Sequence, residues 1–332
     1  MQRESNLLFV NDDNWMSAIP LRVLEEQWWN KKQVSIKGDQ KLQMFMFKGD
    51  SQILIFTNLG RVYMMNGNDF TKNYSSSLQS NYCSIELTSW CKFSFPKIVE
   101  ESNGVNSKER IVSVLSDHDL IDSDQFQLFL ITEKGKCKKL ETKHLRNVSK
   151  SGKIIIQLKD GDQLKQVQKI DSQSEIVLIS SEGKAVRFSS SDVRSMGRNS
   201  MGVKGINLGS RELEGVEGKL SFLTTNLEGN RLLIIGDKGY GKIFKLPQIS
   251  LVKRGNKKGM TCHNLKTSGW IIFASCVNWD DHLIGLTYRN NLHKLQVDKL
   301  PVLDNRYSRG AHILGEKQRF YDSLVEVIKY TN

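Results

Sequence analysis

Short apolar runs that end in a tight turn recur along the chain. Leu-Leu-Phe-Val-Asn-Asp-Asp-Asn14, Ile-Leu-Ile-Phe-Thr-Asn-Leu-Gly60 and Leu-Phe-Leu-Ile-Thr-Glu-Lys-Gly135 share one pattern. It continues in Ile-Val-Leu-Ile-Ser-Ser-Glu-Gly183, Leu-Leu-Ile-Ile-Gly-Asp-Lys-Gly239 and Ile-Gly-Leu-Thr-Tyr-Arg-Asn290. Because each β-prone run is followed by turn residues and a second β-rich segment, each copy predicts a β-hairpin.

The residue that closes each turn is glycine four times and asparagine twice. Both types adopt the left-handed backbone conformation at little cost. We therefore expect a positive φ at Asn14, Gly60, Gly135, Gly183, Gly239 and Asn290. The steps between these turns are 46, 75, 48, 56 and 51 residues. Six units of this size predict an all-β, propeller-like ring.

No Gly/Ser linker divides the chain, so we expect one domain over residues 1–332. The six blades are expected at about 6–50, 51–125, 126–172, 173–229, 230–279 and 280–331. The second blade contains an acidic, serine-rich insertion, 91–125, which we interpret as a surface loop. Helix signals are weak: Leu21–Trp29 suits a turn or two, whereas Asp322–Tyr330 alternates like a closing strand.

Glycines and cations gather again about 17 to 20 residues after several hairpins, ahead of another β-rich segment. The clearest copy is Met196-Gly-Arg-Asn-Ser-Met-Gly-Val-Lys-Gly-Ile206. Looser copies are Arg254-Gly-Asn-Lys-Lys-Gly259, Ser149-Lys-Ser-Gly-Lys153 and Tyr307-Ser-Arg-Gly-Ala311. Two interpretations stay open: a tight bend between strands, or a backbone that approaches phosphate oxygens closely.

The charge of the chain favours an anionic partner. The net charge is +12 and the pI is near 9.4. Residues 1–125 carry -3, whereas residues 126–332 carry +15. The fifth and third repeats are the most basic: segment 230–279 carries +8 and segment 126–172 carries +6.

Several classes of protein are disfavoured. No apolar run approaches the roughly 18 residues of a membrane span, and the amino terminus lacks a secretory pattern, so we expect a soluble, cytoplasmic or plastid-stromal domain without a membrane partner. The five cysteines are scattered and no four ligands converge, so no metal or cofactor is expected. Gly236–Lys242 has the spacing of a phosphate-binding loop, but Ile243 follows instead of serine or threonine. No catalytic constellation stands out, and we expect no enzymatic activity of the domain alone.

At these motifs the sequence resembles the C-terminal domain of the DNA gyrase A subunit over nearly its whole length. The most specific parts are Glu182-Gly-Lys-Ala-Val-Arg-Phe188, Val193-Arg-Ser-Met-Gly-Arg198 with Gly202-Val-Lys-Gly-Ile206, and Gly239-Tyr-Gly-Lys242. The resemblance implies a six-bladed β-pinwheel, whose neighbouring blades exchange strands, and a DNA-wrapping function. The paralogous topoisomerase IV subunit shares the blade repeat.

One segment departs from the family pattern. The family's gyrase box, Gln-Arg-Arg-Gly-Gly-Lys-Gly, is expected after the first hairpin, where this chain has Gln27, Trp28, Trp29, Asn30, Lys31, Lys32 and Gln33. The resemblance implies that the box fixes DNA around the disc, so the lost glycines and arginines put strong wrapping in doubt. Arg254–Gly259 is more similar to the box. For Trp28 and Trp29, packing between blades and stacking near DNA stay open.

Two function classes follow: a sequence-independent DNA-wrapping module, and a propeller whose basic face binds an acidic protein. The resemblance implies the first; its partners would be double-stranded DNA, the N-terminal breakage-reunion domain of the same subunit, and the ATPase B subunit. We expect Lys and Arg of the outer strands and bends to follow the phosphates. The expected DNA-contacting residues are Lys134, Lys136, Lys138, Lys139, Lys150, Lys153, Lys184, Arg187, Arg194, Arg198, Lys204, Lys242, Lys245, Lys253, Arg254, Lys257, Lys258, Arg306 and Arg309. Lys134, Lys136 and Lys138 are expected as one stripe, because alternate strand residues share a face.

Overall fold

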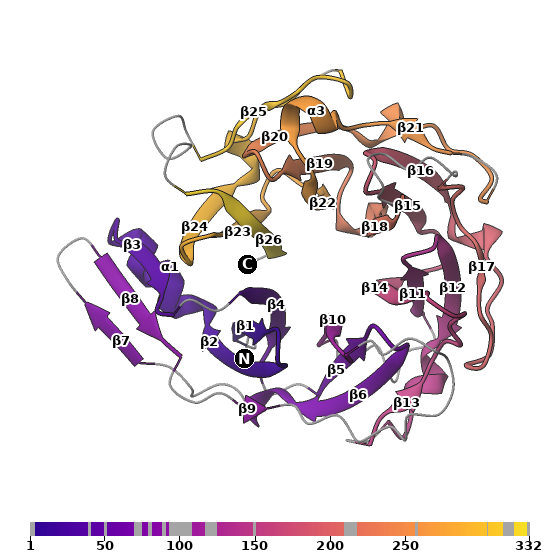
Figure 1. The fold of residues 1–332 in the computed structure, drawn as a ribbon, viewed down its shortest axis with the longest axis horizontal. Coiled ribbons are helices and arrows are strands. Elements are labelled where there is room, and N and C mark those ends of the chain that lie inside the picture. The colour runs from indigo at the N-terminus through magenta and orange to yellow at the C-terminus, as the bar shows by residue number, and fades with distance from the viewer. Residues whose placement is uncertain are drawn as a thin grey trace.

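The computed structural model is an all-β ring of six blades (Figure 1), as the hairpin repeat predicted. It describes residues 4–38, 41–49, 52–69, 75–78, 82–87, 91–92, 108–116, 125–148, 151–208, 218–255, 258–303, 305–314 and 322–330.

Each blade is built on one of the predicted hairpins. These are β1 (Ser5–Asn11) with β2 (Trp15–Pro20), β5 (Gln52–Thr57) with β6 (Arg61–Asn66), β11 (Gln127–Thr132) with β12 (Lys136–Glu141), β15 (Glu175–Ser180) with β16 (Lys184–Ser189), β19 (Arg231–Gly236) with β20 (Tyr240–Lys245), and β23 (His282–Thr287) with β24 (Asn291–Gln296). The φ angles at the six turn residues lie between 58° and 80°. The prediction of left-handed glycine and asparagine at these positions is therefore confirmed.

A third strand from each repeat pairs with the first hairpin strand and lies toward the centre of the ring (Figure 1). These inner strands are β4 (Leu42–Lys48), β10 (Ile111–Leu115), β14 (Leu164–Ile170), β18 (Leu220–Thr225), β22 (Ile271–Val277) and β26 (Leu324–Tyr330). The last of them confirms the closing strand predicted at the C-terminal end.

The fourth strand of each blade comes from the next repeat along the chain. We call it the exchanged strand. The pairs are β9 (Cys91–Lys92) on β2, β13 (Lys153–Ile154) on β6, β17 (Val203–Lys204) on β12, β21 (Met260–Thr261) on β16, β25 (Ala311–His312) on β20 and β3 (Gln33–Ile36) on β24. Because β3 belongs to the first repeat and completes the sixth blade, the exchange closes the ring.

The second repeat differs from the prediction. The stretch 91–125 was expected as a surface loop, but β9 and β10 lie within it and pair with β2 and β5. The stretch is acidic and its two strands are short, of two and five residues, so its sequence pattern did not predict them. A further hairpin, β7 (Ser75–Leu78) with β8 (Tyr82–Glu86), was not expected at all. Since β8 runs parallel to β3, this hairpin extends the sixth blade to six strands.

Helices are short. The predicted turn or two at Leu21 is the nine-residue helix α1 (Leu21–Trp29), and α3 covers Leu265–Ser268. Single 3-10 turns occur at Gly67–Asp69, Thr142–Leu145, Ser190–Asp192, Asn226–Glu228, Leu246–Gln248 and Val297–Lys299. No helix in the described part of the chain has the length and apolar character needed to cross a membrane.

The hydrophobic core is divided among the wedges between neighbouring blades. Leu7 and Phe9 of β1 pack toward the sixth blade, whereas Leu8 and Val10 pack toward the second. Alternate residues of a strand point to opposite faces, and here both faces are buried. This explains why the hairpin strands are continuous apolar runs instead of alternating patterns.

Candidate nucleic-acid interface

Each repeat reaches its exchanged strand through a segment that we call the rim bend. The six rim bends are residues 21–36, 67–92, 142–154, 190–204, 246–261 and 297–312. The exchanged strands β13, β17, β21 and β25, at which four of them end, lie along the outer edge of the ring (Figure 1). These four rim bends therefore end at the periphery of the ring.

The net charge of the chain is concentrated in these bends. In chain order they carry +1, 0, +4, +2, +4 and +1, counting Lys and Arg against Asp and Glu. Together this equals the +12 of the whole chain. The remaining residues are balanced in charge, so the basic character expected from the sequence is a property of the rim.

Several expected DNA-contacting residues are exposed on the rim. They are Arg194, Lys204, Lys253, Lys258 and Arg309. Lys143 and Arg146, which were not among the expected residues, are also exposed in the third rim bend; Lys143 pairs with Glu141. The positive charge of segment 126–172 indicates a basic surface there, but both residues precede the glycine motif at Ser149–Lys153, on which the prediction for this repeat was based.

Arginines join the fifth rim bend to the fourth and the sixth to the fifth. The guanidinium of Arg254 donates from Nε to Asp192 O (2.6 Å) and from Nη1 to Lys204 O (3.2 Å). Arg306 Nε donates to Thr261 O (3.2 Å). Because a guanidinium has five N–H donors, these partly exposed arginines stay able to donate to phosphate oxygens as well.

The glycines of the motif serve the contact between blades. Gly202 and Gly310 have φ angles of 75° and 90°. A Cβ would lie 2.5 Å from Cys137 O at the first position and 2.4 Å from Gly241 O at the second. The bend therefore has to lie directly on the neighbouring strand. At these two glycines the tight bend is the interpretation that the contacts support.

Lys138 and Lys242 are corrections to the expected DNA-contacting set, because both are buried. Lys138 Nζ donates to Ile155 O (2.7 Å), Arg198 O (2.7 Å) and Ser200 O (3.1 Å). Lys242 Nζ donates to the carbonyls of Arg306 and Ser308, the latter at 2.7 Å. Burial lowers the pKa of each ammonium to about 8. These lysines hold the rim bends of the next repeat in place instead of reaching phosphate.

The expected stripe of three ammonium groups is therefore wrong. Lys134 lies in the hairpin turn, where its Nζ donates to Asp160 O (3.1 Å), and Lys136 begins β12. Lys138 occupies the alternate strand position, but that position faces the fourth rim bend. Two of its three acceptor carbonyls, those of Arg198 and Ser200, lie 60 and 62 residues further along the chain, so no local pattern reveals them.

Other expected residues have partners of their own. Arg187 Nε donates to Glu175 Oε2 (2.8 Å), Lys139 Nζ donates to Ser190 O (3.1 Å), and Lys184 pairs with Glu182 (3.4 Å). Three more lie in or near the rim bends: Lys153 and Arg198, which are partly exposed, and Lys245, which is exposed. Lys150 and Lys257 lie outside the described residues.

The gyrase-box position lies at the end of α1. Asn30 caps the helix, Lys31 N donates to Trp28 O (3.0 Å) and Lys32 N donates to Gln27 O (2.9 Å). This is a Schellman cap with Lys31 at the left-handed position, φ 56°. Trp28 packs against the core between the first and sixth blades. Trp29 is 87% exposed. Packing is therefore confirmed for Trp28, whereas stacking of Trp29 near DNA stays a prediction.

Strand register shows which bends correspond. Val34 pairs with Leu292, two residues after Asn290, and Met260 pairs with Ala185, two residues after Gly183. Residues 27–33 are therefore equivalent to 253–259, and both contain Asn-Lys-Lys at the centre. The fifth repeat keeps the terminal glycine and an arginine that the first repeat lacks.

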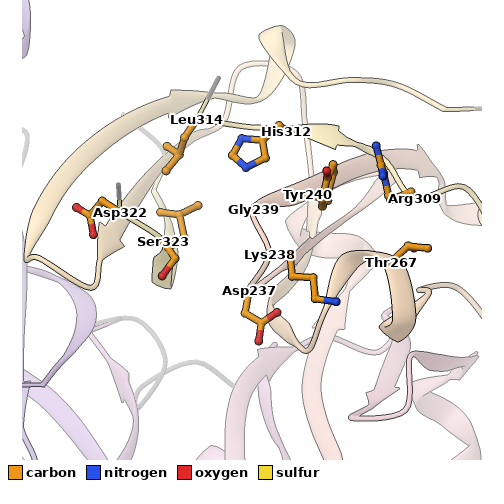
Figure 2. Close-up of a pocket in the computed structure, with 11 residues that line it drawn as sticks. Asp237, Lys238, Gly239, Tyr240, Thr267, Arg309, His312, Leu314, Asp322 and Ser323 are labelled. Carbon is orange, nitrogen blue, oxygen red and sulfur yellow. The ribbon is translucent and has the colours of Figure 1, made fainter. Parts of the chain in front are cut away.

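A pocket of about 410 Å³ lies between the turn of the fifth blade and the sixth blade. Figure 2 shows Tyr240 and Arg309 on one side of it and Asp322 on the other. The guanidinium of Arg309 lies 4.2 Å from the centre of the Tyr240 ring. The lining carries both signs of charge, including Asp237. Across the described ranges, no three His, Cys, Asp or Glu side chains gather to hold a metal.

The family described as "DNA gyrase C-terminal domain, beta-propeller" matches residues 51–73, 127–171, 174–213 and 230–278. The DNA gyrase A protein of Metamycoplasma arthritidis is 25% identical over 327 residues, which cover 97% of this chain and 33% of that protein. Its counterpart from Ureaplasma parvum is 29% identical over 259 residues, 78% of this chain and 28% of that protein. The chain spans about a third or less of the length of these two relatives.

Two solved structures share the fold. The C-terminal domain of DNA gyrase A superposes with a TM-score of 0.71 at 22% identity and covers 98% of this chain and 100% of that chain. The C-terminal domain of DNA topoisomerase IV gives a TM-score of 0.64 at 20% identity and covers 100% and 94%.

Proposed function

The chain belongs to the family of DNA gyrase C-terminal β-propeller domains, and we propose that it binds duplex DNA along its outer rim and bends it. The observation that carries the proposal is the location of charge: the rim bends hold the entire net charge of +12. A polyanion is attracted most strongly where cations follow a continuous path.

The mechanism is ionic contact distributed along a curved surface. Exposed lysines and arginines of successive bends neutralise phosphates, and each neutralised phosphate releases counterions. Bending 20–30 base pairs by 40–90° costs on the order of 1–6 kcal/mol, which these contacts offset. Backbone contacts of this kind carry no base information, so we expect binding that is independent of sequence.

In the parent protein we propose an accessory role. The domain would direct the path of DNA in a type IIA topoisomerase, while a breakage-reunion domain of the same polypeptide and a separate ATPase protein supply the chemistry. The relatives named as DNA gyrase A proteins support this role, and we propose no catalysis by this domain alone.

Salt titration of duplex binding tests the proposal. The variant replaces Arg146, Arg194, Lys253 and Lys258 with Gln, which removes four exposed rim cations. If each meets one phosphate, the slope of log K against log salt should fall by about 3 to 4, at about 0.9 per phosphate.

The matched control replaces four exposed lysines away from the rim bends, Lys41, Lys48, Lys159 and Lys266. It has the same net charge as the rim variant, and its slope should change little. Absence of duplex binding by the unmodified domain would refute the DNA proposal and favour an acidic protein as the partner.

A further inference from the structure

A second pocket, of about 360 Å³, lies where the inner strands β14, β18 and β22 begin. Lys165 of β14 and Ser221 of β18 line it, together with Trp270, which directly precedes β22. Figure 1 shows these neighbouring strands along the central opening of the ring, whereas the exchanged strands β17 and β21 lie along its outer edge. The pocket is therefore on the inner side of the third to fifth blades, away from the rim.

Hydrogen bonds between repeats fix the walls of this pocket. Ser181, in the turn of the fourth blade, donates from its N–H to Lys219 O (2.7 Å) and accepts from Lys219 N at Oγ (3.0 Å). Glu133, in the turn of the third blade, pairs with Lys219 Nζ through Oε2 (3.0 Å). Asp237 N donates to Trp270 O (2.8 Å), and Trp270 N donates to Asp237 Oδ1 (3.0 Å). Residues on opposite sides of the pocket are therefore held in place by backbone contacts.

Lys165 carries a charge that no group of the protein pairs. In the described part of the chain its ammonium has neither a hydrogen bond nor an ion pair, although the residue is partly buried. Burial lowers the pKa of Lys165, and the carboxylates of Glu133 and Glu326 oppose this shift. The charges of Arg110 and Lys219 add to it. Because charged groups inside proteins are usually paired, an anion bound beside Lys165 would supply the missing partner.

Four groups that can donate hydrogen bonds line the pocket: the ammonium groups of Lys165 and Lys219 and the hydroxyl groups of Ser181 and Ser221. Lys219 keeps further N–H donors beside the one that Glu133 accepts, and the Ser181 hydroxyl, which accepts from Lys219 N, still has its proton to donate. A phosphate group has three terminal oxygens that accept hydrogen bonds. The donors therefore suit a phosphate better than a carboxylate, which has only two oxygens.

Trp270 gives the same pocket an aromatic wall. It is 46% exposed, and its two backbone bonds to Asp237 hold it at the pocket. Nucleic-acid bases stack on exposed aromatic side chains. Small-molecule sites commonly have volumes of about 300–1,000 Å³, so a pocket of about 360 Å³ suits a single nucleotide.

We propose that this pocket binds a mononucleotide, with the phosphate at Lys165 and the base stacked on Trp270. Lys219 and the two serine hydroxyl groups complete the contacts to the phosphate. The pocket is separate from the rim, so this inference goes beyond the proposed function and does not depend on DNA binding there.

The test is isothermal titration calorimetry of the domain with adenosine monophosphate (AMP), in the absence of DNA. Lys165→Gln and Trp270→Ala remove the two main contacts. The controls are Lys159→Gln and Trp279→Ala, which change an exposed lysine and an exposed tryptophan outside the pocket. A thermal unfolding midpoint for each variant verifies that it is folded. Ribose 5-phosphate, which lacks the base, and adenosine, which lacks the phosphate, are titrated in parallel.

Lys165→Gln should weaken AMP binding by about tenfold or more, because a charge-assisted hydrogen bond is lost. Trp270→Ala should weaken it by about five- to tenfold, because stacking is lost, and both controls should bind AMP like the unmodified domain. Ribose 5-phosphate and adenosine should each bind more weakly than AMP. Failure of AMP to bind, or equal losses in the controls, would overturn the proposal, and equal affinity for ribose 5-phosphate would overturn the contact of the base with Trp270. Since DNA takes no part in these titrations, their outcome is distinct from failure of the proposed function.

Discussion

Lys31 adopts a backbone conformation that glycine adopts at lower cost. Its φ of 56° is left-handed, and the Schellman bonds of Lys31 and Lys32 require this conformation at the end of α1. The family's box has glycine here, which adopts the conformation without a Cβ penalty. Lysine at this left-handed position therefore costs stability.

Replacing Lys31 with glycine should stabilise the domain. A left-handed non-glycine residue costs roughly 1–2 kcal/mol, and the added entropy of glycine in the unfolded chain offsets part of the gain. We expect the free energy of unfolding to rise by about 0.5–1 kcal/mol, measured by urea denaturation. Lys32→Gly is the control, because Lys32 has no positive φ; it should be neutral or destabilising. A decrease for Lys31→Gly would show that the lysine side chain stabilises the bend.

Glu326 gives the domain a pH-dependent stability. It lies on β26, and its Oε1 accepts a hydrogen bond from Met44 N (2.9 Å). Burial raises its pKa to about 7, although the Met44 hydrogen bond and the charges of Lys41 and Lys165 oppose the shift. The unfolded pKa is about 4.3, so the folded state binds more protons between these values. Stability from this group is complete below about pH 4.3 and is lost as pH rises through 7.

The variant Glu326→Gln should remove this loss. The amide oxygen still accepts from Met44 but does not ionise, so we expect the variant to exceed the unmodified domain in stability at pH 8 by about 1–3 kcal/mol. Urea denaturation from pH 4.5 to pH 8 measures this. Glu86→Gln, which changes an exposed carboxylate, should leave the pH profile as it is. A profile that keeps its slope in Glu326→Gln would assign the pH dependence to another group.

At the scale of elements, the sequence predicts what local chemistry decides. The hairpins were predictable because Gly135 or Asn290 meets a backbone requirement within its own turn. The β7–β8 hairpin was not predictable, because the Ser-Ser-Ser-Leu78 strand has no apolar alternation. In addition, β8 joins the sheet by pairing with β3, which is distant in the sequence. The orientation of Lys138 was likewise hidden, since its partners Arg198 and Ser200 belong to the next repeat. Contacts that depend on strands exchanged between repeats therefore could not be predicted from local sequence patterns.

The correspondence of the first and fifth rim bends predicts the result of a transplant. Gln27→Lys, Trp28→Arg, Trp29→Gly and Gln33→Gly give residues 27–33 the sequence of residues 253–259. The variant gains two cations and a flexible bend, so the salt slope of duplex binding should rise by up to about 2. DNA writhe captured by ligation of nicked circles should also increase.

The control for the transplant carries the same glycines with Gln27→Ala and Trp28→Ala. It loses the Trp28 packing equally but gains no charge, so it should bind like the unmodified domain or more weakly. Equal gains in both variants would assign the effect to flexibility, and no gain in either would show that the first bend does not meet DNA.

At the scale of the whole molecule, charge is uneven around a ring whose blades are alike. The third and fifth rim bends carry +4 each, the fourth carries +2, and the first, second and sixth carry +1, 0 and +1. The third to sixth bends share one architecture, a 3-10 turn followed by a two-residue exchanged strand. Among these bends we therefore expect charge to decide which part of the rim binds DNA most tightly. We infer that the duplex is held over the third to fifth bends and more loosely elsewhere.

Two quadruple variants of equal charge test this location. One replaces Lys143, Arg146, Lys253 and Lys258 with Gln in the third and fifth bends, and the other replaces Arg22, Lys31, Lys299 and Arg309 in the first and sixth. Each set includes one cation with an ion pair, Lys143 with Glu141 and Arg22 with Glu4. Since both variants drop to a net charge of about +8, long-range attraction weakens equally. A local path predicts a slope reduced by about 3 to 4 in the first variant and by about 1 in the second. Equal reductions would mean that the field of the whole domain governs binding, and the assignment of a track along the third to fifth bends would be wrong.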